Sequence, residues 1–495
     1  MKVFRNAFWL TTGRVTGDIA SFALFVAISR SFGPATTGEY SFSFALASLL
    51  AFLACAGFDE CGTSLYARAD EAARRRLWSD LLTAQYVQLV CAVLCFAIFV
   101  ALTGGLRARP SVIVELSALL TCQYLARTFF IPAMASQSMK APALTDFVCR
   151  FGAIAFALAS IWAGQTSLPA LLVGFPAAGV LLVVLAARNA AAHGVSLLPH
   201  GNLRRVAQTL RATSTFTGCE LLGQFYSRTD FLLIAFMLGN ADVGLYATNM
   251  KFVEYGVLPL FLFGIAAYPS LTRAAAFDPA AFRGSVRELA RFMLFLAGWL
   301  AVGLYCLVPL LITPIFGAAF APAAAILPWF AGLALLKGCE GTFYRVAYAV
   351  RRPSIYLVAM LAGTALTIVL NLALIPRLRL VGAVIAAMAS VGVVFLICAA
   401  QLRSSLAPAV MIGTLLRLGA ALGATGAVFL AVEQLDVAPW VAALAACGAY
   451  PIFGLAAGLL THPSRSVLHA EVHAPHAEVH ASHAELHGPP DTRSA

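Results

Sequence analysis

Stretches of about 20 consecutive apolar residues recur along almost the whole chain, and this recurrence constrains the fold more than any other feature. A helix of that length crosses the ~30 Å hydrocarbon core of a bilayer. The runs are continuously apolar rather than alternating, so they predict helices and not the strands of a barrel. The sequence therefore predicts an all-α polytopic membrane protein with about fourteen transmembrane helices, near residues 7–30, 40–64, 80–103, 112–135, 143–163, 168–187, 212–238, 243–268, 290–312, 322–349, 354–375, 380–400, 410–432 and 438–460.

One segment near the N-terminus is repeated in the middle of the chain. Residues 25–40, FVAISRSFGPATTGEY, align with residues 231–246, FLLIAFMLGNADVGLY, at a constant offset of 206. Each copy is an apolar run, a short polar turn between two glycines, and a second apolar run. Such a duplication indicates two similar membrane bundles facing each other, as in secondary transporters. Both copies begin on the same side, so we expect two parallel six-helix lobes and a V-shaped transporter, with a C-terminal pair of helices added.

The basic residues fall mostly on one side of this arrangement. Hydrophobic residues make up 61% of the chain and charged residues 11%, yet the formal net charge is +11. With the N-terminus in the cytoplasm, most arginines and lysines fall in inner loops. The outer loops receive only Arg30, Arg107, Arg109, Arg377 and Arg379. This bias, with an even number of spans, predicts a multi-pass inner-membrane protein with both termini cytoplasmic. The basicity reports topology, and we expect no nucleic-acid partner.

These features divide the chain into five parts. We expect an N-lobe at residues 1–187, a cytoplasmic amphipathic linker at 188–211, a C-lobe at 212–400, spans thirteen and fourteen at 401–460, and a His-rich cytoplasmic tail at 461–495. A second basic, helix-compatible connection lies at residues 269–289.

The tail is built from a seven-residue repeat, HAEVHAP, HAEVHAS and HAELHGP, over residues 469–489. Its His-x-x-x-His spacing could place two imidazoles on one helix face as metal ligands. The favoured interpretation is a disordered tail, because prolines interrupt any helix there. The eleven cysteines are scattered without a C-x-x-C pair, which is typical of small buried apolar residues. We therefore predict no metal site and no cofactor.

Ionisable residues inside the spans need an explanation, because each costs at least ~2.5 kcal/mol on insertion scales. Neighbours at i, i+3 or i+4 can neutralise each other so that a helix inserts, which suffices for Asp146–Arg150 and Lys337–Glu340. The alternative is that charges line a water-filled cavity between the lobes. Ionisable residues within the spans also include Arg14, Asp18, Glu115, Arg127, Glu220, Arg228, Asp230, Lys251, Glu254 and Arg345.

The cavity interpretation is favoured for Arg14, Arg228 and Lys251, which lie in the first two spans of each lobe. Arg127 and Arg150 are further candidates for contacting a substrate. Arginine presents a planar fork that matches phosphate oxygens, and such charge-assisted contacts are strong away from water. A substrate that carries a pyrophosphate would suit such a cavity.

Four acids accompany the cations. Asp18, Glu220, Asp230 and Glu254 are candidates for binding a proton or a sodium ion that drives transport, or for serving only as counter-ions. The sequence does not decide between these roles.

Several segments together resemble a known family. Residues 228–270, with Arg-x-Asp at the start and the Gly…Gly-x-Tyr turn, resemble the central segment of Wzx-type polysaccharide-biosynthesis flippases. IFGAAFAPAAAIL (315–327), NLALIPRLRLVGAVIAAMAS (371–390) and FGPATTGEY (32–40) fit the same pattern. That family belongs to the superfamily that also contains multidrug and toxic-compound exporters and the lipid II flippase.

The resemblance implies a two-lobed transporter that moves undecaprenyl-pyrophosphate-linked oligosaccharide repeat units to the outer leaflet by alternating access. In this chain Arg14, Arg228 and Lys251 would hold the pyrophosphate while the lipid tail stays in the bilayer. Expected partners are the lipid-linked oligosaccharide, membrane lipids, a proton or sodium ion, and the polymerase and chain-length machinery of the pathway.

Two other function classes compete with a flippase. A multidrug exporter of the same superfamily would be expected to have twelve spans and an acidic cavity. A membrane glycosyltransferase would need a sizeable loop with acid/base residues, whereas the outer loops here are short, such as residues 164–167. No P-loop pattern occurs, so ATP hydrolysis by this chain is not expected. We therefore expect a transporter and not an enzyme.

Overall fold

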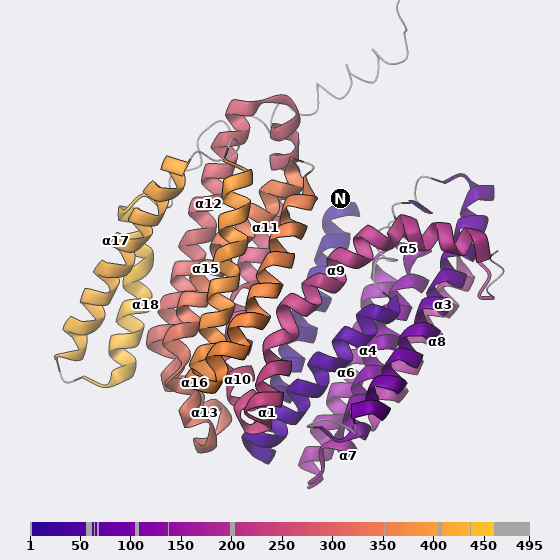
Figure 1. The fold of residues 1–495 in the computed structure, drawn as a ribbon, viewed down its shortest axis with the longest axis horizontal. Helices are drawn as coiled ribbons and strands as arrows, with labels where there is room; N and C mark the ends of the chain where they lie inside the picture. The colour runs from indigo at the N-terminus through magenta and orange to yellow at the C-terminus, as the bar shows by residue number, and fades with distance from the viewer. Residues whose placement is uncertain are drawn as a thin grey trace, which may run out of the picture.

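A computed structural model of the chain describes residues 2–55, 62–63, 65–66, 69–103, 108–136, 138–198, 203–350, 352–403, 408–435 and 437–459. All regular structure in these residues is helical, as the sequence predicts. Figure 1 shows two bundles that meet at one end and diverge toward the other, so the molecule is V-shaped. The two ends are called the closed end and the open end below. The histidine repeat of residues 469–489 lies outside the described residues.

The first bundle contains α1 and the helices that follow it up to α8. Their bounds are α1 Lys2–Cys55, α3 Glu71–Thr103, α4 Pro110–Phe129, α5 Ile131–Ala135, α6 Lys140–Trp162, α7 Leu168–Leu172 and α8 Gly174–Ala192.

The second bundle is formed by the following helices up to α16, and a final pair packs on its outer side (Figure 1). Their bounds are α9 Leu203–Met237, α10 Asn240–Gly256, α11 Leu258–Phe277, α12 Pro279–Val302, η1 Gly303–Leu307, α13 Val308–Phe316, η2 Ala318–Phe320, α14 Ala321–Ala324, α15 Leu327–Ala349, α16 Pro353–Gln401, α17 Pro408–Glu433 and α18 Pro439–Ala456.

The number of membrane crossings follows from these helices. Ten helices in the described residues are long and apolar enough to span a bilayer, and the bent pair Ala318–Ala324 and Leu327–Ala349 makes an eleventh. The longest two, α1 and α16, are each two helices joined at a break, at Gly33 and at Arg379. Each of them therefore contributes one more crossing, which gives thirteen candidates. The remaining span that the sequence predicts, residues 212–238, falls in α9, which is long enough to cross a bilayer but less apolar than those helices.

The described residues of the segment 188–211 belong mostly to two long helices. Residues 188–192 end α8, and residues 203–211 begin α9. The connection at 269–289 is helical on both sides of Asp278, whose carboxylate accepts hydrogen bonds from the backbone N–H groups of Ala280 and Ala281 at 2.8 and 3.0 Å. Asp278 therefore ends one helix and caps the next.

The turns between successive crossings share one backbone feature. Gly33, Gly239 and Gly317 have φ values of 75°, 108° and 99°, and Arg379 has φ 51°. Positive φ is readily adopted by glycine and is strained for a residue with a side chain. The glycine turn seen twice in the sequence is thus a recurring device for reversing the chain at the closed end.

The two copies of the duplicated segment pack against each other at the closed end. A Cβ added to Gly38 would lie 1.7 Å from the carbonyl oxygen of Asn240, and one added to Gly244 would lie 2.1 Å from that of Pro34. The two contacts are related by the sequence offset, so they form a pseudo-symmetric pair. Because no side chain larger than hydrogen fits there, these glycines allow α1 and α10 to approach closely.

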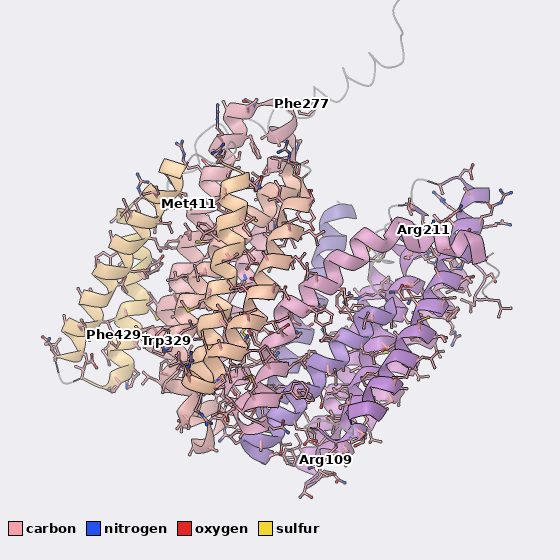
Figure 2. The ribbon with its side chains drawn as sticks, in the orientation of Figure 1. Arg109, Arg211, Phe277, Trp329, Met411 and Phe429 are labelled. Atoms are coloured by element: carbon pink, nitrogen blue, oxygen red, sulfur yellow. The ribbon has the colours of Figure 1, made fainter. Side chains whose placement is uncertain are left out.

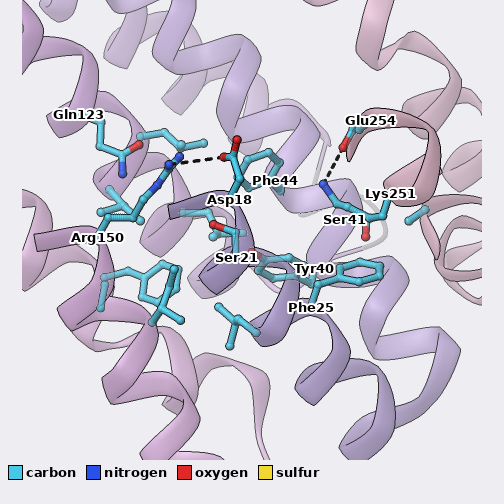
Figure 3. Close-up of a pocket in the computed structure, with 18 of the residues that line it drawn as sticks. Asp18, Ser21, Phe25, Tyr40, Ser41, Phe44, Gln123, Arg150, Lys251 and Glu254 are labelled. Atoms are coloured by element: carbon cyan, nitrogen blue, oxygen red, sulfur yellow. Dashed lines mark hydrogen bonds and ion pairs between the residues drawn. The ribbon is translucent and has the colours of Figure 1, made fainter. Parts of the chain in front are cut away.

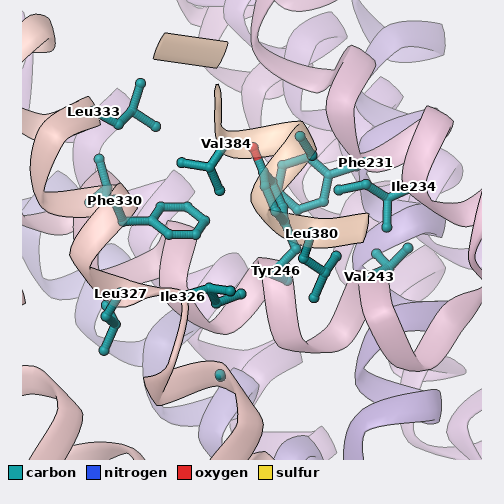
Figure 4. Close-up of a cluster of buried hydrophobic side chains, with 14 of the residues drawn as sticks. Phe231, Ile234, Val243, Tyr246, Ile326, Leu327, Phe330, Leu333, Leu380 and Val384 are labelled. Atoms are coloured by element: carbon teal, nitrogen blue, oxygen red, sulfur yellow. The ribbon is translucent and has the colours of Figure 1, made fainter. Parts of the chain in front are cut away.

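A continuous apolar core extends from this contact across both bundles. It includes Phe25 of α1, Phe231 and Ile234 of α9, Tyr246 of α10 and Phe330 of α15, all of them buried. Figure 4 shows the part of this core in which Phe231, Tyr246 and Phe330 face one another. The closed end is therefore tightly packed.

Large apolar side chains are exposed on the outside of the molecule. Figure 2 places Arg109 at the closed end and Arg211 and Phe277 toward the open end. Exposed large apolar side chains on the outer helices include Trp162, Val180, Leu416 and Ile452. An outer surface of this kind suits contact with acyl chains.

Candidate substrate cavity

A cavity of about 330 Å³ lies between the two lobes, on the open side of the packed core. Helices α1, α4, α6 and α8 form one wall, and α9, α10 and the start of α11 form the other. Its charged lining residues are Asp18, Arg150, Arg228, Lys251 and Glu254. Figure 3 shows Asp18 beside Arg150 and Lys251 beside Glu254.

Glu254 holds two cations on the second wall. Its Oε1 accepts a hydrogen bond from Nη1 of Arg228 at 3.2 Å, and its Oε2 accepts one from Nζ of Lys251 at 2.8 Å. Lys251 and Glu254 are three residues apart on α10, so they share a helix face. Arg228 reaches the same carboxylate from α9. The three side chains together carry one positive charge in excess.

Aromatic rings surround the two cations. The guanidinium of Arg228 lies 5.6 Å from the ring centre of Phe44, and Nζ of Lys251 lies 6.0 Å from the same ring. Lys251 also lies 5.7 Å from the ring centre of Tyr255. Such contacts stabilise a partly desolvated cation without using its hydrogen-bond donors. Phe44 comes from α1, so it joins the two lobes at this point.

Both cations keep donors that no described residue accepts. Arginine has five N–H donors and lysine three, and the contact to Glu254 is the one side-chain hydrogen bond found for each among the described residues. The Nε atom of Arg228 is buried and lacks a hydrogen-bond partner in this part of the chain. The site can therefore accept an additional ligand that is rich in oxygen atoms.

The first wall carries a second ion pair. Nη1 of Arg150 on α6 lies 3.8 Å from Oδ1 of Asp18 on α1. Gly17 makes this approach possible, because a Cβ at that position would lie 2.9 Å from Nη1 of Arg150. The alternative pairing of Arg150 with Asp146 on its own helix is not formed. Gln123 of α4 lies beside Arg150 (Figure 3).

The remaining candidates occupy different places. Asp230 is buried inside the C-lobe, where it accepts hydrogen bonds from the hydroxyl of Tyr246 at 2.9 Å and from Nδ2 of Asn371 at 2.8 Å. Arg228 and Asp230 are two residues apart, which is about 200° around a helix, so they face opposite directions. Arg127 is exposed, lies 4.7 Å from the ring centre of Tyr124, and is not among the residues that line the cavity.

The side chains of Arg14 and Glu220 lie outside the part of the chain whose side chains the structure describes. The predicted pair Lys337–Glu340 is confirmed, with 3.0 Å between Nζ and Oε2. Its Glu340 also accepts a hydrogen bond from the hydroxyl of Tyr356 at 3.0 Å. This group is buried within the C-lobe and is not among the residues that line the cavity.

Sequence reasoning missed three residues of the site. Gln123 is a polar residue in an apolar run, and that signal could have identified it. Phe44 and Gly17 carry no such signal, because phenylalanine and glycine are common in membrane spans. Their roles depend on which helices pack together. A single sequence does not reveal that.

A second cavity, of about 510 Å³, adjoins the first and is apolar. It is lined mainly by Val15, Ile19, Phe22, Leu300 and Leu304, from α1, α12 and η1. It shares Asp18, Tyr255 and Leu258 with the charged cavity. A charged compartment thus continues into an apolar one at the junction of the lobes.

These features define a class of protein: a polytopic helical transporter of two lobes with a charged cavity between them. The family model of polysaccharide biosynthesis proteins matches residues 3–275, which is more than half of the chain. The chain belongs to this family. No curated protein is a significant match by sequence.

Solved structures of the superfamily share the fold. The lipid II flippase MurJ in an inward closed conformation is 13% identical, with a TM-score of 0.70 over 90% of this chain and 97% of that one. An inward-facing multidrug resistance transporter of the MATE family is 12% identical, with a TM-score of 0.64 over 79% of this chain and 95% of that one. The Vibrio cholerae MATE transporter VcmN is 16% identical, with a TM-score of 0.56 over 81% and 97%. At these identities the likeness concerns the fold.

Proposed function

We propose that this protein is a flippase of undecaprenyl-pyrophosphate-linked oligosaccharide repeat units, used for O-antigen, capsule or exopolysaccharide synthesis. It moves them across the bacterial inner membrane and is not an enzyme. The family membership and the transporter fold support this proposal. The open end faces the cytoplasm, as do both termini, because the basic loops gather on that side.

The observation that carries the proposal is the sharing of one carboxylate by two cations. Arg228 and Lys251 both contact Glu254, and both retain donors toward the cavity. A pyrophosphate brings more negative charge and more oxygen atoms than a single carboxylate. It can therefore compete with Glu254 for both cations. Glu254 offsets one of the two positive charges, and both cations contact the substrate when it binds.

The rest of the substrate has matching surroundings. Ser21, Ser41, Gln123 and Tyr40 line the charged cavity and offer hydrogen-bonding groups to sugar hydroxyls. The adjoining apolar cavity supports a route by which the polyprenyl tail stays in hydrocarbon while the head group enters. Alternating access then requires the closed end to separate while the open end closes.

Loss of the two cations tests the proposal. We expect Arg228→Gln and Lys251→Gln each to lower export roughly 10- to 100-fold, since one charge-assisted hydrogen bond contributes about 1.5–3 kcal/mol. The measurement is the accumulation of lipid-linked repeat units on the cytoplasmic side in cells that depend on the variant. Arg273→Gln, an exposed cation of α11 that does not line the cavity, is the matched control. Normal export by the double variant would refute the proposal.

A multidrug exporter is the second candidate. It would need an acid open to a cationic drug, whereas Asp18 and Glu254 are each held by a cation. A strain that lacks the protein should therefore keep its drug resistance and lose its surface glycan. Increased drug sensitivity with an intact glycan would favour the exporter. A glycosyltransferase is less favoured, because the described connections between spans are short.

The coupling of transport to an ion remains a separate proposal. Asp18, Glu220, Asp230 and Glu254 are the acids that could bind a proton or sodium ion. Replacing Glu220 or Asp230 by its amide should change the dependence of export on pH or sodium concentration. Unchanged export under all of these conditions would remove both acids from the coupling mechanism. Partnership with the polymerase and chain-length machinery is proposed from the pathway alone.

A further inference from the structure

A cluster of arginines lies between α12 and α17, far from the central cavity. Arg283, Arg287 and Arg291 follow one another at four-residue intervals on α12, so they lie along one face of the helix. Arg283 and Arg287 are exposed, and Arg291 is partly buried. Like charges at this spacing repel each other. The arrangement therefore opposes helix stability and calls for a compensating ligand.

Helix α17 adds a fourth arginine to the cluster. The two helices pack together, with Leu289 and Met293 of α12 in the same apolar cluster as Leu418 of α17. Arg417 is close enough to Arg291 for their charges to interact repulsively. Nη1 of Arg417 also donates a hydrogen bond to the carbonyl oxygen of Gly458, just after α18, at 3.1 Å. Three helices thus hold the cationic group in place.

The cluster has little negative charge to balance it. Glu288 interacts electrostatically with Arg291, and Asp278 is engaged in capping the start of α12. Among the residues whose side chains are described, none forms an ion pair with any of the four arginines. Among the described residues, four arginines face two acids, so two positive charges are left unbalanced.

One donor of the cluster is buried without an acceptor. The Nε atom of Arg291 is inaccessible to solvent and lacks a hydrogen-bond partner among the described residues. Buried donors in folded proteins nearly always have a partner, so this donor is available to a ligand. A ligand that suits this donor and the surrounding charges must be an anion with several oxygen atoms.

The position in the membrane restricts the source of that anion. The cluster lies near the open end: α12 begins there beside Phe277, and α17 begins there beside Met411 (Figure 2). Below the arginines, α12 continues as an apolar span to Val302. On α17 the large apolar side chains of Ile412 and Leu416 are exposed. A guanidinium at this level, next to lipid-facing apolar side chains, lies where the head groups of a bilayer lie.

We propose that Arg287, Arg291 and Arg417 bind the phosphate group of a membrane lipid where α17 packs against α12. Arg291 and Arg417 contact the phosphate oxygens from the two helices, and Arg287 approaches from the head-group side. The acyl or prenyl chains follow the apolar surface of α17. Basic pockets between membrane helices are suited to such head groups. The site is independent of the substrate proposed above, because it requires only that the chain spans a membrane.

Native mass spectrometry of the purified full-length protein tests this site. The probes are phosphatidylglycerol, cardiolipin and undecaprenyl phosphate, with zwitterionic phosphatidylethanolamine as the reference lipid. We expect the wild type to retain at least one anionic lipid more than fivefold better than the reference. Arg291→Gln and Arg417→Gln should each remove most of this preference, and Arg291→Lys should keep an intermediate part. Arg211→Gln, an exposed cation of α9, should change it less than twofold.

The outcomes of this experiment show which kind of lipid supplies the phosphate group. Binding of phosphatidylglycerol and cardiolipin identifies a resident phospholipid, and selective binding of undecaprenyl phosphate identifies a carrier lipid. Both support the site. An unchanged preference in folded Arg291→Gln/Arg417→Gln protein would overturn it, with folding checked by gel filtration and thermal unfolding. The proposal also fails if lipid binds only after residues 461–495 are removed. In that case the acidic residues of the tail would occupy the arginine cluster in the full-length protein.

Discussion

The two copies of the duplicated segment have kept the same packing and acquired different chemistry. Phe25 and Ile28 of the first copy are buried, and so are their counterparts Phe231 and Ile234. The glycines of both turns adopt positive φ, and the glycine five residues later contacts the backbone of the other copy in each case. Close packing tolerates few changes, so these positions are the ones that match.

Some of the positions that differ carry a charge in one copy only. At the offset of 206, Asp230 corresponds to the buried Leu24, and Lys251 corresponds to the buried Ala45. Tyr246 is buried and donates to Asp230, whereas its counterpart Tyr40 lines the cavity. The repeated segment therefore forms the frame of both lobes. The second copy has a cation in the cavity and an acid in the C-lobe interior, where the first copy has buried apolar residues.

Breaking the shared packing should have the largest effect. Gly38→Ala and Gly244→Ala place a Cβ against backbone atoms of the other copy, which cannot move as a side chain can. We expect each to destabilise the closed end by about 3 kcal/mol, the upper part of the usual range for overpacking. Thermal unfolding in detergent and spin-label distances across the closed end would measure this. Gly341→Ala, which meets no atom within 4 Å, is the control.

An equal melting temperature for Gly38→Ala and Gly341→Ala, with an unchanged distance across the closed end, would show that the packing there is not tight.

The acid that distinguishes the copies should have the next largest effect. Asp230→Leu gives the second copy the residue of the first, and it leaves the hydroxyl of Tyr246 and Nδ2 of Asn371 without their acceptor. Each unpaired buried donor costs about 1–3 kcal/mol, so we expect a loss of roughly 2 kcal/mol or more. Asp230→Asn keeps one oxygen acceptor and should lose less. Unfolding midpoints of the two variants, measured side by side, test this order.

The prediction would be contradicted if Asp230→Leu unfolded at the temperature of the wild type. Adding Tyr246→Phe to Asp230→Leu removes one of the two orphaned donors, and we therefore expect it to recover part of the loss.

The sequence predicted the elements of the fold better than the contacts of the site. Apolar length and the repeat predicted the spans, because both depend on local composition. The pair Lys251–Glu254 also follows from spacing on one helix. Arg150 instead pairs with Asp18, 132 positions earlier in the chain, because Gly17 admits its side chain. Asp230 points away from Arg228 toward Asn371. The helix period alone could have predicted that Arg228 and Asp230 do not line the same cavity. Partners so distant in sequence require the tertiary structure.

The smallest expected effect concerns the turn of α16, where Arg379 stands in place of glycine. Arg379 has φ 51° and donates from Nη2 to both carboxylate oxygens of Asp242, at 3.1 and 2.9 Å. Positive φ costs a side-chain residue about 1 kcal/mol, and an exposed ion pair returns less than ~1 kcal/mol. We expect Arg379→Gly to be neutral within ~0.5 kcal/mol and Arg379→Ala to be about 1 kcal/mol less stable than Arg379→Gly. Unfolding midpoints at low and high salt test both statements, because salt weakens the ion pair of the wild type. If Arg379→Ala were the more stable variant, the turn would not need the conformation that Gly33 and Gly239 share.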